Sequence, residues 1–141
     1  MTDLARHVSN RRVWSTVVGP EHTVPRLPID SPGLARMPEV LATPMLVAMA
    51  ECACAAHLAA LAGPEVLSLG TEVTIAHTAA TPVGLTVTIT TELAATDGRR
   101  VTFAFTAHDG LDEAGSGRHT RAIVAPERVA QRLAEKRARS G

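Results

Sequence analysis

Aromatic residues are almost absent from this sequence of 141 residues. Trp14, Phe103 and Phe105 are the whole set, so Val, Leu, Ile, Ala and Thr must fill the core. A core rich in β-branched residues favours sheet. With 45% hydrophobic residues and no long low-complexity stretch, the sequence predicts one globular domain.

Net charge is absent as well. Fourteen basic residues balance fourteen acidic ones, and the basic residues gather mainly at the two ends of the chain. There is no basic stripe with interleaved aromatic residues, which is the pattern typical of a nucleic-acid surface. We therefore expect no nucleic-acid partner.

Cysteine is scarce. Cys52 and Cys54 are the two present, and on a helix their side chains would point about 200° apart, which excludes a mutual disulfide. We interpret both as small core residues.

Spacings typical of metal sites and of several enzyme classes are also missing. A metal would require His77, His108, Asp109 and His119 to converge, yet no pair of them has a recognised ligand spacing. We expect turn or strand-edge roles for them, no metal and no cofactor. The absence of a Gly-x-Ser-x-Gly elbow and of a phosphate-binding glycine loop argues against serine hydrolases and nucleotide triphosphatases.

The N-terminal residues contain no apolar signal segment. The one long apolar run is interrupted by Glu51 and His57. We expect a cytoplasmic protein without a membrane-spanning segment.

What the sequence does contain is a single carboxylate, Glu51, inside the apolar run of residues 44–56. An unpaired carboxylate is costly in apolar surroundings, so it must find a partner or raise its pKa. A core hydrogen bond or an ion pair between subunits would satisfy it. A partnered carboxylate is also what an acid, base or nucleophile requires, so Glu51 is a candidate catalytic residue.

Thr43 and Pro44 predict the start of the helix that carries Glu51. Threonine can cap a helix, and proline suits its first position. The helix should run to Leu61 or Ala62, where Gly63 and Pro64 follow. Since its residues are apolar nearly all round, we expect a buried central helix.

Alternating apolar residues predict strands on both sides of this helix, with hairpin signals at Asp97-Gly98 and Asp109-Gly110. Gly115 and Gly117 suggest a bulge or the close approach of another backbone. Within a domain spanning residues 12–141, the expected strands cover about 13–18, 73–78, 85–93, 101–107 and 113–124.

Three further segments complete the predicted fold. Residues 1–11 should be a loose leader. Four prolines in residues 21–39 predict an irregular surface loop, which could act as a lid. Residues 127–137 have a helical pattern and should close the fold from outside. The result is an α+β fold in which an antiparallel meander wraps a long central helix, and the large apolar sheet face predicts a homodimer.

Two histidines accompany these elements. His77 lies on the more apolar face of its strand, where a satisfied core histidine and a catalytic one are both open readings. His57 is about 240° around the helix from Glu51, so we expect it at the surface or an interface. Thr43 lies about 12 Å from Glu51 along the axis, so they could border one elongated pocket without touching.

A longer pattern of motifs resembles the fluoroacetyl-CoA thioesterase family. The resemblance covers about residues 13–124 and implies the hot-dog fold, in which two subunits pair. The matching residues are Pro38-Glu39-Val40, Ala42-Thr43, Glu51-x-Ala53-Cys54, Ser68-Leu69-Gly70-Thr71, His77-Thr78-Ala79-Ala80-Thr81-Pro82, Glu92, Gly98-Arg99-Arg100, Ala107-His108-Asp109-Gly110, Asp112-Glu113, Gly115-Ser116-Gly117, His119 and Arg121.

The resemblance also implies roles. Thr43, Glu51 and His77 match a catalytic set in which Glu51 attacks the thioester carbonyl or activates a water, Thr43 orients it and His77 handles protons. Gly70 and Arg121 match substrate-binding positions, and Gly70 would offer its backbone N–H to the carbonyl oxygen. The implied substrate is a short acyl-CoA.

The lid departs from the family pattern. Leu34 and Met37 stand where the fluoroacetyl-selective form has two phenylalanines, which changes the shape around the acyl group. Fluoroacetyl-CoA and another short or medium acyl-CoA are both open as substrates. A hydratase of enoyl thioesters and a non-catalytic acyl-thioester binding module are the alternatives on the same fold.

Overall fold

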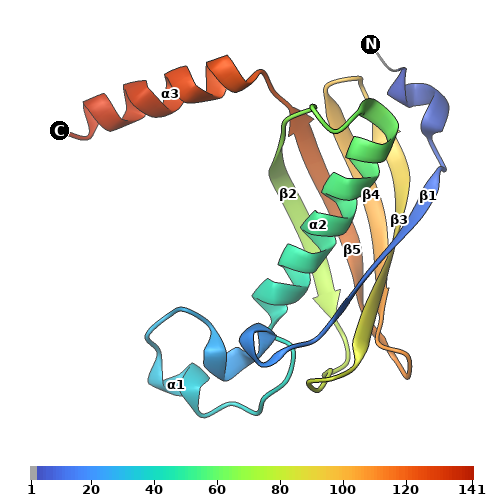
Figure 1. The fold of residues 1–141 in the computed structure, drawn as a ribbon, viewed down its shortest axis with the longest axis vertical. Helices are drawn as coiled ribbons and strands as arrows, with labels where there is room; N and C mark the ends of the chain where they lie inside the picture. Colours follow the sequence, from blue (N-terminus) through green and yellow to red (C-terminus); the bar gives the residue numbers. More distant parts are fainter. Residues whose placement is uncertain (1–2) are drawn as a thin grey trace.

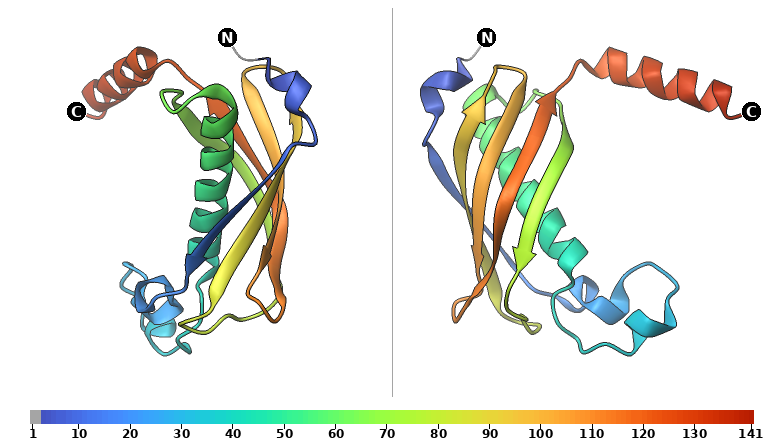
Figure 2. Two further views of the ribbon diagram at one scale, coloured as in Figure 1. Left: turned by 45° about the vertical axis from the view of Figure 1, so that its right-hand side comes forward. Right: turned by 180° about the vertical axis from the view of Figure 1, so that it is seen from behind.

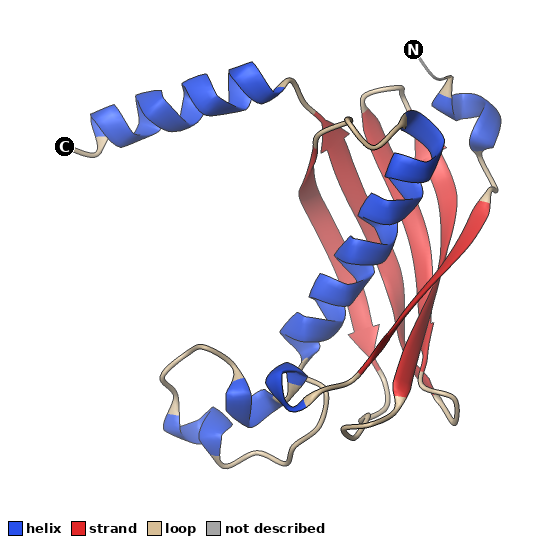
Figure 3. Cartoon of the chain, in the orientation of Figure 1, coloured by secondary structure: helices blue, strands red, loops and turns tan. Residues whose placement is uncertain are grey.

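The computed structural model describes residues 3–141. A five-stranded antiparallel sheet in the order β1-β3-β4-β5-β2 curves around the long helix α2 (Figures 1 and 3). The elements are η1 (Leu4–His7), β1 (Arg11–Val17), η2 (Pro20–His22), η3 (Val24–Arg26), α1 (Pro32–Ala35), α2 (Thr43–Ala62), β2 (Ser68–His77), β3 (Thr86–Thr96), β4 (Arg100–His108), β5 (Glu113–Ile123) and α3 (Pro126–Arg139).

Helix α2 has the predicted extent. Pro44 lies in its first turn, and Gly63, with a φ of 106°, follows its last residue. The N-cap is Ala42, whose side chain can accept no bond, so Thr43 is the first helical residue and is free for another contact. The plain N-cap interpretation of Thr43 is therefore wrong.

The alternating apolar residues of β3 and β4 form the inward faces of these two strands. Val87, Ile89 and Leu93 of β3 are fully buried, as are Val101 and Phe103 of β4. They pack on one side of α2, whose buried face is Leu46, Met49, Ala50, Ala53, Cys54, His57 and Leu58.

The opposite side of α2 is open in the single chain, contrary to the expected burial all round. Thr43, Pro44 and Cys52 are exposed, so the core interpretation holds for Cys54 and not for Cys52. An apolar composition does not distinguish burial within one chain from burial against a second.

Helix α2 also has the length and hydropathy of a membrane-spanning helix, as core helices can, so the expected lack of a membrane segment stays a prediction.

The strand order differs from the predicted meander. Strands β3, β4 and β5 follow one another, but β2 crosses to the far side of β5. Gly115 and Gly117 make this pairing close, since a Cβ on either would collide with the carbonyl oxygen of Ala76 or Thr74 in β2. The register shifts between Gly70 and Glu72.

Both ends of the chain also differ from expectation. Residues 3–10 are not loose, because Leu4 is buried against Leu58 and Phe103. Met1 and Thr2 lie outside the described residues. Helix α3 forms where predicted but extends away from the body instead of closing it, and it buries no residue (Figure 2).

His57 is buried, not at the surface. Its Nδ1 lies 2.8 Å from Thr91 Oγ1 and its Nε2 lies 2.8 Å from Asn10 Oδ1. The pKa of His57 is lowered, mainly by burial and further by the charge of Arg12. Both ring nitrogens have partners, so this histidine has a structural role.

Candidate active site

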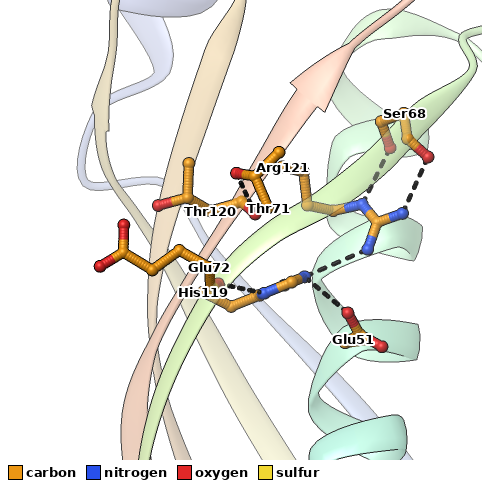
Figure 4. A network of polar contacts seen from close by, with 7 residues as sticks. All are labelled: Glu51, Ser68, Thr71, Glu72, His119, Thr120 and Arg121. Carbon is orange, nitrogen blue, oxygen red and sulfur yellow. Dashed lines mark hydrogen bonds and ion pairs between the residues drawn. The ribbon is translucent and has the colours of Figure 1, made fainter.

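Glu51 lies on the side of α2 that faces the ends of β2 and β5 (Figure 4). Its side chain is 42% exposed, and its Oε1 lies 3.5 Å from Nε2 of the buried His119. The carboxylate is therefore neither enclosed in the core nor neutralised by a close ion pair within the described residues. It is available to a reacting group.

The partners of His119 fix its tautomer. Its Nδ1 lies 2.8 Å from the carbonyl oxygen of Glu72, which can only accept, so Nδ1 carries the proton. Its Nε2 lies 3.1 Å from Nη1 of Arg121, which can only donate, so Nε2 presents its lone pair. With the Nε2 lone pair directed to Arg121, the 3.5 Å contact between His119 and Glu51 is not a hydrogen bond.

Arg121 is held on its other side by Ser68. Its Nε donates to Ser68 Oγ at 2.8 Å and its Nη2 donates to the Ser68 carbonyl oxygen at 3.0 Å. These bonds orient the guanidinium plane beside His119 (Figure 4). A fixed positive group near Glu51 can stabilise negative charge that develops on a substrate oxygen.

Gly70 is the residue of β2 that meets Glu51. A Cβ there would lie 2.5 Å from Glu51 Oε1 and 3.0 Å from His119 Cε1. A side chain would therefore displace the carboxylate. Glycine also leaves the β2 backbone accessible beside Glu51, as a backbone donor to a carbonyl oxygen requires.

Cys54, one turn from Glu51 on α2, is not a competing nucleophile. Burial raises the pKa of its thiol to about 12, against a lowering by the charge of Arg121 and a further raising by that of Glu51. A thiol with so high a pKa is protonated near neutral pH and unreactive.

Thr43, at the start of α2, and His77, at the end of β2, form a second cluster. Thr43 Oγ1 and His77 Nδ1 are 2.8 Å apart, and either can be the donor. His77 Nε2 is buried without a hydrogen-bond partner among the described residues. When the Nδ1 proton points to Thr43, Nε2 is a free base, which suits the predicted role in proton handling.

A hollow of about 290 Å³ opens beside this second cluster. The lid segment lies at the same end of the molecule, next to the start of α2 (Figure 1). Leu34 in α1 is half-buried, whereas Met37 is 49% exposed. The residues that line the hollow are Val24, Val40, Leu41, Thr43, His77, Thr78, Ala79 and Ala80.

The predicted site residues therefore form two groups within one chain. Gly70, Glu51 and Arg121 come together, and so do Thr43 and His77. Within one chain Thr43 contacts His77, and its predicted role in orienting Glu51 stays a prediction. Six residues of β2 lie between Gly70 and His77, so the two are roughly 20 Å apart along an extended strand.

Two residues of the Glu51 group were missed or misplaced. The sequence interpretation assigned His119 a turn or strand-edge role, yet it is buried in β5 and contacts Glu51. Ser68 has no assigned role in that interpretation. The signal was the alternation of β5, because His119 and Arg121 are two residues apart and share one face.

Comparison with known proteins relates this fold and site to one family. Residues 18–127 match the family described as fluoroacetyl-CoA-specific thioesterase. The chain belongs to this family. The chain is similar to a fluoroacetyl-CoA thioesterase of Streptantibioticus cattleyicolor. The two are 44% identical over 129 residues, which cover 92% of this chain and 93% of that protein.

Solved structures agree with this membership and confirm the hot-dog fold. The fluoroacetyl-CoA thioesterase FlK superposes with a TM-score of 0.86 at 44% identity, covering 92% of this chain and 96% of that one. A FlK variant in complex with fluoroacetate and CoA gives 0.81 at 46% identity, over 86% and 98%. A thioesterase superfamily member from Thermus thermophilus gives 0.80 at 25% identity, over 95% and 96%.

Proposed function

We propose that the chain is an acyl-CoA thioesterase that converts a short acyl-CoA to the free acid and CoA. The observation that carries this proposal is the Glu51 carboxylate, which is accessible and bordered by Gly70 and His119. Membership of a thioesterase family and the CoA held by the related FlK variant support it.

The chemistry assigns a part to each group. Glu51 either attacks the thioester carbon or removes a proton from an attacking water. In the first route Glu51 displaces the CoA sulfur and forms an anhydride, which water then cleaves to the acid and free Glu51. In the second route the deprotonated water displaces the sulfur directly. In both routes the C–S bond breaks, the acid takes its new oxygen from water, and a proton from that water reaches the CoA thiolate, with His77 as the carrier. Gly70 N–H and Arg121 face the developing negative oxygen.

Release of free thiol from a panel of acyl-CoAs tests the reaction. We expect thiol release from at least one short acyl-CoA. Hydration of an enoyl-CoA without thiol release would favour the hydratase alternative. Binding of acyl-CoA without either reaction would favour the binding module.

The lid residues bear on the choice of acyl group. Leu34 and Met37 are less bulky and more flexible than the phenylalanine pair of the fluoroacetyl-selective pattern, so we propose a broader short-acyl range that includes fluoroacetyl. The double variant L34F/M37F should raise the ratio of kcat/KM for fluoroacetyl-CoA to that for acetyl-CoA about tenfold, the lower end of what one methylene group contributes to discrimination in an apolar pocket. An unchanged ratio would contradict the proposed role of Leu34 and Met37 in the choice of acyl group.

We also propose that the chain acts as a homodimer paired through β2. Among residues 3–141, no strand pairs with the outer edge of β2. Leu69 and Val73 of β2 are exposed, and one side of α2 is open. Unpaired edges and exposed apolar strips favour pairing with a second copy. An antiparallel β2–β2 pairing about the strand centre would bring the Gly70 end of one strand to the His77 end of the other.

Such a dimer would unite the two groups of site residues. Mixing two inactive variants, E51Q and H77A, tests it. If each site takes Glu51 and His77 from different chains, each mixed dimer has one intact site, and random exchange should restore roughly a quarter of full activity. No restored activity, with exchange verified by mass, would contradict a shared site. The cytoplasmic location stays a prediction.

A further inference from the structure

A basic hollow lies where β5 gives way to α3, outside the two groups of site residues. Its volume is about 280 Å³. Three guanidinium groups line it, from Arg99 in the β3–β4 hairpin and from Arg128 and Arg132 one turn apart on α3. Apolar residues of the β5–α3 junction form the remainder of the wall, and no carboxylate contributes to it.

The three positive charges are uncompensated. Among residues 3–141, none of these guanidinium groups forms an ion pair or a side-chain hydrogen bond. Like charges around one hollow repel each other, and a bound anion with several charges would relieve this repulsion. Planar guanidinium groups suit phosphate in particular, because they can donate two parallel hydrogen bonds.

The start of α3 adds to this positive field. Its N-cap, Ala125, forms no side-chain cap, and Ala125 itself lines the hollow. Pro126 has no N–H, and the N–H groups of Arg128 and Val129 donate to the carbonyl oxygen of Ala125, so among the described residues Glu127 N–H is the one first-turn donor left without a partner. Helix N-termini favour phosphate for this reason.

The hollow adjoins the Glu51 group on the same face of the sheet. Ile123 lines the hollow and follows Arg121 by two residues in β5, so the two side chains share a face and lie roughly 7 Å apart along the strand. Val124 N–H bonds to the carbonyl oxygen of Leu67, next to the Ser68 that holds Arg121. A substrate arm can thus pass from Glu51 over Arg121 to the hollow.

We propose that this hollow binds the phosphate groups of the CoA nucleotide. The inference rests on the proposed thioesterase function and names the part of the substrate that is recognised away from the reacting carbon. The acyl thioester lies at Glu51, the pantetheine arm passes Arg121, and the 3′-phosphate and diphosphate lie among Arg99, Arg128 and Arg132.

Thioesters of one acyl group on CoA, on 3′-dephospho-CoA and on pantetheine test this proposal. R128E and R132E should each raise KM for the acyl-CoA about tenfold with kcat nearly unchanged, because charge-assisted bonds to phosphate are lost. The same variants should leave the kinetic constants for acyl-pantetheine unchanged. They should also reduce the difference in KM between the thioesters of CoA and of 3′-dephospho-CoA.

R137E is the matched control. Arg137 is nine residues from Arg128, about 180° around α3, and does not line the hollow, yet its substitution changes the charge equally. KM for the acyl-CoA should stay within about twofold in R137E. Three results would each overturn the proposal: an equal rise of KM in R137E, an equal loss of activity on acyl-pantetheine in R128E and R132E, or an unchanged KM for the acyl-CoA in both of these variants.

Calorimetric titration separates this inference from the proposed reaction. CoA should bind the unaltered chain more tightly than pantetheine, and R128E should remove most of that difference, whether or not the chain releases thiol. Absence of thiol release from every thioester would refute the reaction alone. Equal binding of CoA and pantetheine would refute the nucleotide site.

Discussion

The two ends of the site differ in how their side chains are held. Around Glu51 the partners come from two paired strands, and each of His119 and Arg121 is anchored to the backbone of β2. Around His77 the anchor is one hydroxyl group, Thr43, beside a hollow and the lid segment. The Glu51 end is therefore the more firmly held of the two, and the His77 end, beside the hollow and the lid segment, is the more adaptable.

The largest effect should come from the Glu51 end. E51Q keeps the shape of Glu51 and removes its charge, so kcat should fall on the order of a thousandfold, as expected for a lost base or nucleophile. Since the side chain is partly exposed, the thermal midpoint should change little. Thiol release and thermal unfolding measure the two effects, and unchanged turnover would refute the role of Glu51.

Gly70 tests how closely the carboxylate must be placed. G70A puts a methyl group 2.5 Å from Glu51 Oε1 and should displace it, which costs about a hundredfold in kcat. G33A is the control, because the nearest atom to a Cβ at Gly33 is 3.9 Å away. Equal activities of the two variants would mean that the contact at Gly70 does not restrain Glu51.

His119 and His57 are both buried and both bonded through two ring nitrogens, but one adjoins Glu51 and the other does not. H119N removes the acceptor of Arg121 and should lower kcat about tenfold. H57N should instead lower the free energy of unfolding by about 1 to 3 kcal/mol and leave kcat unchanged. Similar kinetic effects in both would contradict a positioning role for His119.

The smallest effect concerns pH. The pKa of His57 in the folded chain lies below its ordinary value of 6.5, mainly through burial, so the unfolded chain binds a proton first on acidification. Its stabilising contribution is complete above pH 6.5 and is lost as pH falls below that value. H57Q should therefore show a smaller fall in thermal midpoint than the unaltered chain between about pH 7.5 and 5.5. An equal fall of the thermal midpoint in H57Q and in the unaltered chain would mean that groups other than His57 cause the pH dependence.

Much of the fold could be predicted from local patterns. Alternation gave the inward faces of β3 and β4, and Pro44 and Gly63 marked the ends of α2, because these signals act within a few residues. The place of β2 next to β5 could not be predicted, since alternation identifies a buried face but not a neighbouring strand. The same limit applies to α3, whose sequence indicates a helix without indicating what it packs against.

For the candidate site, too, the local signals could be predicted from the sequence and the long-range contacts could not. Glu51 stood out because a lone charge in an apolar helix is costly. His119 did not stand out, because its contact with Glu51 depends on the pairing of β2 with β5, two strands that are far apart in the sequence. The roles of Thr43, His77 and Gly70 stay predictions until the variants are measured.

The register shift between Gly70 and Glu72 has a consequence for how β2 can change in evolution. Ile75 and His77, odd-numbered, face α2, and so does the even-numbered Gly70. Thr71 is the inserted residue that reverses the alternation between them. Deleting it would direct Gly70 to the outer face, so β2 should not tolerate a change of length between Gly70 and Ile75.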